Sequence, residues 1–228
     1  IAAVLSGLPG EADRDFALNL AVAAARRAPG GMTLYIDLSL PGTEAGIALD
    51  LELGFGVQDT LREIARLDRA FLESAVARCP RTGLYVMGQS GDAAAWDGPA
   101  FAGLLQILRT ICDVIVVGYG PFSRGCILPE DERVFLCCNQ RFPSLRAAGA
   151  LLRTLDGITP QLVIHQLAPG RTPSPTDIRK VLEIADSIDL ETDWGDLAAH
   201  LNRASPLALA SSRYSRALDA CLARLDIS

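Results

Sequence analysis

The sequence predicts an α/β fold with three layers, in which a doubly wound, mainly parallel sheet is covered by helices on both faces. Three observations predict it. The segments with strand character are apolar throughout, as strands buried on both faces are. Segments with helical periodicity separate them along the chain. Half of the 228 residues are hydrophobic and only 21% are charged, which is enough for one sizeable core.

The elements of the first half are punctuated by glycine and proline. An apolar strand over 1–5 leads to a helix of about 13–27, which the Pro-Gly-Gly run at 29–31 ends. A strand over 32–37 is followed by a turn at Pro41 and Gly42. A helical stretch of roughly 44–78 is interrupted by Gly54 and Gly56, and a strand follows at 83–87.

The second half continues the alternation. Helices are expected at 99–111, 142–156 and 177–183, and two more near the C-terminus. Strands are expected at 113–117, 133–138, 161–165 and 184–188, each of them short and largely apolar.

The segment between the first strand and the first helix has the layout of a phosphate-binding loop but carries the wrong charge. Glycines there precede a helix, whose N-terminal N–H groups and dipole favour an anion. A nucleoside triphosphatase also needs a cation, usually a lysine on the β- and γ-phosphates. Lys180 is the only lysine in the chain, and the first helical turn carries Glu11, Asp13 and Asp15 instead.

The segment that ends in Asn-Leu-Ala at 19–21 resembles the deviant Walker A motif of the MinD/ParA ATPases, K-G-G-x-x-K-[ST]-T-x-x-x-N-L-A. In this alignment the family's phosphate-binding lysine falls on Asp13, and the residue that holds Mg²⁺ falls on Arg14. The signature lysine and the glycine pair fall on Leu8, Pro9 and Gly10.

Two further segments are similar to landmarks of the same deviant Walker P-loop family. The strand end at 35–39 resembles V-D-x-D, with its first aspartate kept as Asp37 and its second replaced by Ser39. Residues 113–121 are similar to D-x-V-V-V-D-x-P, and Gly118 stands at the Walker B aspartate. The resemblance covers nearly the whole chain and implies one MinD/ParA-like domain over 1–228.

Two stretches, 53–72 and 205–210, look most like the pilus-assembly branch known as CpaE or TadZ. The chain begins at Ile1, directly in a strand and without an initiator methionine. That start fits a domain excised from a longer protein, and CpaE-like proteins often carry an N-terminal receiver-like domain before it.

The substitutions predict that binding of ATP and Mg²⁺ is lost and that the protein is not an enzyme. A charge-assisted hydrogen bond from lysine to phosphate contributes about 1.5–3 kcal/mol. A carboxylate about 4 Å from a phosphate charge repels it by about 4 kcal/mol at an effective dielectric constant near 20. Two interpretations of the acidic turn remain open. The carboxylates fill the anion site from within the chain, or they are ordinary first-turn acids of a surface helix.

Other polar residues favour structural roles. Asp37 is expected to cap the turn that follows its strand, and His165, at the position of an adenine-reading asparagine in the family, to have a local partner. Nothing in the spacing of Asp13, Asp15 and Asp37 demands a hard cation. The six cysteines show no metal-binding spacing, so they predict buried filler in a reducing compartment.

Composition excludes several classes of partner. A net charge of −6 argues against a nucleic-acid surface, which needs a basic stripe. The absence of an 18-residue apolar run predicts a soluble, cytoplasmic protein. The C-terminal helix at 213–225 is amphipathic but not strongly basic, which favours packing on the protein's own sheet over membrane binding. At most a peripheral membrane association is expected.

The predicted function is that of a non-catalytic MinD-like adaptor. It would position or scaffold a bacterial Flp/Tad-type pilus machine through homodimerisation and partner binding, at the inner-membrane face or the cell pole. Alternatives are a residual MinD/ParA-type ATPase that uses Arg14 as its cation, and an adaptor of another envelope system such as cellulose export. The candidate dimer or partner surface, unless its members only pack their own loops, comprises Leu8, Leu40, Tyr119, Pro121, Phe122, Ile127 and Leu128.

Overall fold

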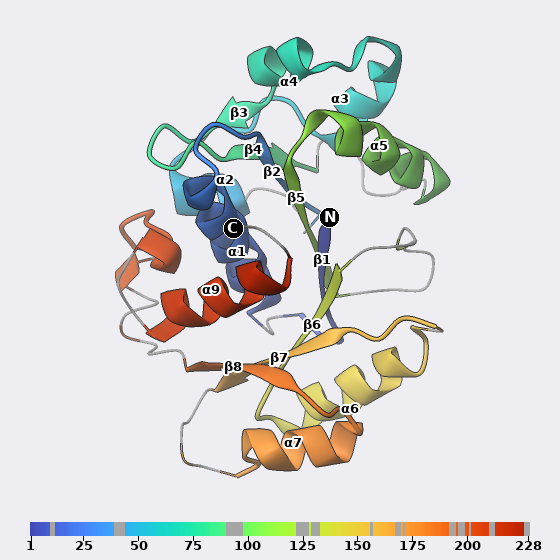
Figure 1. The fold of residues 1–228 in the computed structure, drawn as a ribbon, viewed down its shortest axis with the longest axis vertical. Helices are drawn as coiled ribbons and strands as arrows, with labels where there is room; N and C mark the ends of the chain where they lie inside the picture. Colours follow the sequence, from blue (N-terminus) through green and yellow to red (C-terminus); the bar gives the residue numbers. More distant parts are fainter. Residues whose placement is uncertain are drawn as a thin grey trace.

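A sheet of eight strands runs through the centre of the computed structural model, counted over the residues that it describes (Figure 1). These residues are 1–9, 12–38, 44–89, 98–121, 128, 133–155, 157–166, 170, 172–191, 195, 199–200, 202–209 and 213–225. The strands are β1 (Ala2–Ser6), β2 (Thr33–Asp37), β3 (Ala77–Arg78), β4 (Tyr85–Gly88), β5 (Val114–Pro121), β6 (Arg133–Asn139), β7 (Gln161–Gln166) and β8 (Ser187–Glu191). Their order is β3-β4-β2-β5-β1-β6-β7-β8, and all neighbours are parallel except β3 and β4.

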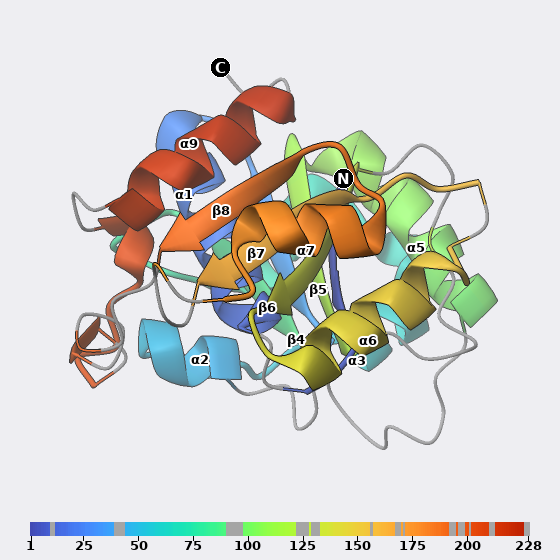
Figure 2. The ribbon, with the colours of Figure 1, turned by 90° about the horizontal axis from the view of Figure 1, so that it is seen from below.

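Helices cover both faces of the sheet, as the sequence predicts (Figures 1 and 2). One layer holds α1 (Asp13–Arg27), α2 (Glu44–Leu49), the 3₁₀ turn η3 (Leu207–Leu209) and α9 (Arg213–Arg224). The other holds α3 (Val57–Arg62), η1 (Ile64–Arg66), α4 (Arg69–Ala75), α5 (Gly98–Ile111), α6 (Phe142–Leu152) and α7 (Pro175–Leu182). The predicted three-layer architecture is confirmed.

The apolar composition of the strands follows from this double cover. In β1, Ala2 and Val4 belong to the core on the α1 side, whereas Ala3 and Leu5 belong to the core on the α5 side. Each strand therefore needs apolar residues at successive positions. The five cysteines among the described residues are buried in these cores and form no disulfide, which fits the prediction that they act as small apolar side chains.

Three segments differ from the sequence-based expectation. The stretch predicted as helical over 44–78 contains α2, α3, η1, α4 and the antiparallel strand β3. Between α2 and α3 the chain is extended, and Gly56 pairs with Gly88 of β4 as an isolated bridge. The last strand begins at Ser187, since Glu183 ends α7 in a left-handed conformation (φ 55°). Strand β5 extends four residues beyond the predicted end, to Pro121.

Helix α9 packs against α1 and β8, as expected for a helix that covers its own domain. Tyr214, Leu218 and Leu222 are buried on its inner face. Asp219 accepts a hydrogen bond from Arg27 of α1 at 3.1 Å. Of the helices described, none combines the length and the apolarity that crossing a bilayer requires.

Asn19 joins α1 to the C-terminal segment. Its Nδ2 donates to the carbonyl of Asp15 at 2.7 Å, and its Oδ1 accepts from the backbone N–H of Ala208 at 2.8 Å. The side chain is buried, with 3% of its surface exposed. This asparagine therefore links α1 to the 3₁₀ turn η3, which is distant in the sequence.

We predict that Asn19→Ala lowers the free energy of unfolding by about 1–3 kcal/mol, because it leaves the buried N–H of Ala208 without its acceptor. Urea denaturation followed by circular dichroism measures the change. The control is Asn202→Ala at an exposed position, for which we expect less than about 0.5 kcal/mol. Equal effects of the two substitutions would contradict the role given to Asn19.

Candidate functional site

The candidate site lies where β1, β2 and β5 end side by side at the carboxyl edge of the sheet. In the register of these neighbours, Gly118 is opposite both Val4 and Asp37. Open α/β folds place their ligands at this edge. The loop after β1 and the first turns of α1 and α2 complete the site.

The loop after β1 is held against α6. A Cβ on Gly7 would lie 2.7 Å from the carbonyl carbon and the Cβ of Ala147, so only glycine permits this approach. Ser6 Oγ donates to the carbonyl of Leu8 at 3.0 Å. Leu8 is half-buried and Pro9 is exposed, whereas Gly10 and Glu11 lie outside the described residues. Ala12 closes the loop with a left-handed backbone (φ 59°).

The first turn of α1 places acidic groups inside the site. Asp13, which aligns with the phosphate-binding lysine, is only 3% exposed. Its Oδ2 lies 4.0 Å from the position that a Cβ on Gly120 would take. Burial, together with the charge of Glu44, raises the pKa of Asp15 to about 6, while Arg14 opposes the shift. The interpretation of these residues as ordinary surface acids is therefore wrong for Asp13.

The phenol of Tyr35 occupies the space beside Gly118. A Cβ on Gly118 would lie 2.7 Å from Tyr35 Oη, and 3.4 Å from its Cε2 and Cζ. Tyr35 is 1% exposed. Burial raises its pKa well above the usual value, and the charges of Asp37, Asp13 and Asp15 add to the shift. The hydroxyl is therefore neutral and leaves no room for a side chain at position 118.

Strand β5 contains a bulge immediately after Gly118. The pairing of β1 with β5 shifts by one residue between Val4 and Leu5, which leaves Tyr119 as the additional residue. Its ring packs edge-on against Phe101 at 6.2 Å between centroids, and the side chain is 6% exposed. Tyr119 was predicted to supply interface surface; this prediction is wrong, because β5 continues through this residue and its side chain, like those of Ile115 and Val117, belongs to the core on the α5 side.

Asp37 and Arg14 both connect the site to α2. Asp37 Oδ2 accepts from the backbone N–H of Ala45 at 3.3 Å, in the first turn of α2, so Asp37 has the capping role predicted for it. Arg14 forms an ion pair with Glu44 of the same turn. Arg14, next to the residue that aligns with the family's phosphate-binding lysine, therefore already has a carboxylate partner.

A cavity of about 290 Å³ lies between α1, α2 and the end of β2. Its charged groups are the carboxylates of Asp15, Asp37 and Glu44 and the guanidinium of Arg14. This volume is at the lower limit for a small-molecule site. The charge is unfavourable for a polyphosphate, because three carboxylates face one cation.

His165 belongs to the core and does not line this cavity. Its ring packs edge-on against Phe16 at 6.3 Å between centroids, and 1% of the residue is exposed. Burial lowers its pKa to about 4. Its Nε2 has no hydrogen-bond partner within the described part of the chain, so the predicted local partner is not found there. Within the same residues, no group of three or more histidines, cysteines or carboxylates is arranged to hold a metal ion.

The remaining members of the candidate dimer or partner surface divide into two groups. Leu8, Pro121 and Leu128 are half-buried, and Leu128 packs against the core on the α5 side. Leu40, Phe122 and Ile127 lie outside the described residues. Sequence reasoning also missed Tyr35 as a site residue, because its contact with Gly118 depends on the pairing of β2 with β5.

Comparison with solved structures identifies the fold. A ParA family ATPase from Chlorobium tepidum superposes with a TM-score of 0.84 at 21% identity, over 97% of this chain and 96% of that one. MinD in the MinC:MinD cell division complex of Aquifex aeolicus gives 0.79 at 20%, over 100% and 96%. MinD with Mg-ADP from Pyrococcus horikoshii gives 0.75 at 16%, over 99% and 95%. No protein-family model and no curated protein sequence matches the chain. The chain thus has the fold of the MinD and ParA P-loop ATPases.

Proposed function

We propose that this protein is a non-catalytic MinD-like adaptor, which acts by binding partners without hydrolysing ATP. One observation carries the proposal: the Tyr35 hydroxyl takes the space that a side chain at Gly118 would need. In the motif that β5 resembles, this position carries the Walker B aspartate. Here an aspartate does not fit without displacing a buried tyrosine.

The charges around the site support the same proposal. Asp13 stands in place of the phosphate-binding lysine, and Arg14 is paired with Glu44. Loss of the lysine removes a contact of about 1.5–3 kcal/mol, and a carboxylate in its place adds repulsion of similar size. Asp13 and Asp15 at the N-terminus of α1 interact favourably with the helix dipole, so the chain supplies its own anions at that position.

The adaptor role rests on partner binding in proteins of this fold and on the CpaE/TadZ-like stretches. The Aquifex MinD structure is a complex with MinC, so a protein of this fold presents a surface to a partner. We propose a bacterial Flp/Tad-type pilus machine as the partner, at the inner-membrane face or the cell pole. Leu8, Pro121 and Leu128 would contribute to a homodimer that forms without nucleotide.

We predict that isothermal titration of the protein with Mg²⁺-ATP gives no binding at physiological nucleotide concentrations. The double variant Leu8→Lys with Asp13→Lys should gain measurable affinity, because it restores both missing cations. The matched control, Glu52→Lys with Ala70→Lys, adds the same charge at exposed positions and should not bind. A dissociation constant in the low micromolar range for the unmodified protein would refute the proposal and favour the residual ATPase.

A second prediction concerns pH. The pKa of Asp15 in the folded protein, about 6, exceeds its unfolded value of about 3.9, so the folded state binds more protons between these values. Stability therefore falls as pH rises through this window, and the ionised carboxylate lowers it by on the order of 1–3 kcal/mol at pH 7.5. Asp15→Asn should raise the free energy of unfolding at pH 7.5 and flatten its decline between pH 4 and 7.

Urea denaturation at a series of pH values measures the free energy of unfolding of the unmodified protein and of Asp15→Asn. Glu52→Gln is the control at an exposed site. The control should keep the pH dependence of the unmodified protein. An Asp15→Asn variant that is less stable at pH 7.5, with an unchanged decline, would show that the carboxylate is stabilising there.

A further inference from the structure

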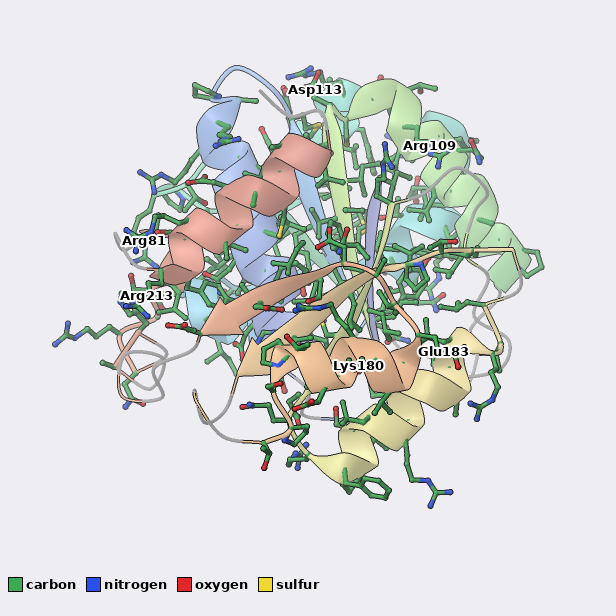
Figure 3. All side chains as sticks on the ribbon, turned by 60° about the horizontal axis from the view of Figure 1, so that its bottom comes forward. Arg81, Arg109, Asp113, Lys180, Glu183 and Arg213 are labelled. Atoms are coloured by element: carbon green, nitrogen blue, oxygen red, sulfur yellow. The ribbon has the colours of Figure 1, made fainter. Side chains whose placement is uncertain are left out.

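A second concave surface, here called the α6/α7 groove, lies on the opposite layer. It has a volume of about 650 Å³ and runs between two helices that pack side by side (Figures 2 and 3; Lys180 and Glu183 mark α7 in Figure 3). Leu145 and Leu182 form its buried floor. Its size falls within the range of ligand and peptide sites.

The edges of the groove are apolar and exposed. Three large hydrophobic side chains of the described residues are strongly exposed, and two of them line this groove: Phe142 at 72% and Val181 at 68%. Gly149 also lines the groove, where a Cβ would only reach van der Waals contact with Leu182 Cδ2 at 3.4 Å. Exposed apolar residues gathered around a concavity indicate an interaction site.

The charge of the groove has the opposite sign to that of the whole protein. The segment 141–153 carries three arginines and no carboxylate, whereas the net charge of the chain is −6. Arg146 and Arg153 line the groove, and neither has an ion-pair partner among the residues described. The carboxylate of Asp177, also at the groove, accepts from the N–H (2.9 Å) and the hydroxyl (2.7 Å) of Ser174.

The spacing of Arg146 and Arg153 along α6 sets the distance between the charges that a partner helix would need. Helix α6 has eleven residues, about 16 Å at 1.5 Å per residue. Arg146 and Arg153 are seven residues apart, which is about two turns or 10.5 Å. A helix lying along the groove would meet both guanidinium groups with acidic residues at the same spacing, and would set apolar residues between them against Leu145 and Leu182.

We propose that the α6/α7 groove binds an acidic amphipathic helix of a partner protein, with apolar anchors between two carboxylates seven residues apart. This inference rests on the proposed adaptor function and adds to it the place and the chemistry of partner recognition. Charge complementarity favours an acidic partner, because Arg146 and Arg153 have no ion-pair partner among the described residues and lie on a protein with a net charge of −6.

The test uses the full chain and two labelled fourteen-residue helical peptides of identical composition, measured by fluorescence anisotropy. In the first peptide two glutamates seven residues apart flank a leucine stripe. In the second both glutamates move by two positions, which turns them about 200° around the axis. We expect the first peptide to bind at least tenfold more tightly.

Substitutions in the groove test whether this difference in peptide affinity arises there. Arg146→Glu with Arg153→Glu should abolish the preference, and Phe142→Asp should weaken binding of the first peptide at least tenfold. Arg216→Glu, at an exposed position on α9, should change its affinity less than twofold. Thermal unfolding checks that each variant is folded.

Three results would overturn the proposal. The first is equal affinity for the two peptides, and the second is a Phe142→Asp variant that binds normally. The third is sedimentation of a dimer that Phe142→Asp dissociates, which would make a second copy of this chain the occupant. Titration of the same variants with Mg²⁺-ATP tests the proposed function separately, since ATP binding with peptide binding intact would refute the predicted loss of nucleotide binding and leave the groove as a partner site.

Discussion

The Tyr35 hydroxyl beside Gly118 is the contact on which the rest of the site depends. The phenol of Tyr35, on β2, lies against Gly118 of the neighbouring strand β5, which carries no side chain at this position, and Tyr119 forms a bulge directly after it. Asp37 in turn bonds to the first turn of α2. Groups that would meet a ligand in an open site are here engaged with the chain itself.

Electrostatics and packing act in the same direction at this edge. Burial keeps the Tyr35 phenol neutral and raises the pKa of Asp15, so the cavity combines an apolar wall with carboxylates in low dielectric. Its guanidinium, Arg14, is paired with Glu44. The α6/α7 groove has exposed apolar edges and two arginines without an ion-pair partner among the described residues, so it suits a charged partner better than the cavity beside α2 does.

Sequence patterns predicted the layers and most elements because strands buried on both faces are apolar at every position. The limits of α1, predicted as about 13–27, agree with the structure because Pro29 and two glycines end it. Tyr119 was not expected in the core because the strand was predicted to end at 117; β5 continues to Pro121, and Tyr119 points to the α5 side as Val117 does. Nor could the patterns identify Tyr35, whose role depends on a contact with a strand about eighty residues later. The α6/α7 groove was missed for the same reason, because it forms only when two separate helices pack together.

The most direct measurement is the cost of Gly118→Ala in two backgrounds, the unmodified protein and Tyr35→Phe. Gly118 does not have a positive φ, so alanine suits the backbone, and any clash must come from Tyr35. With the hydroxyl present we expect a loss of about 1–3 kcal/mol in the free energy of unfolding. Without it the nearest atoms are the ring carbons at 3.4 Å, and the loss should fall below about 0.5 kcal/mol. An equal loss in both backgrounds would show that the hydroxyl does not fill this space and would contradict the account.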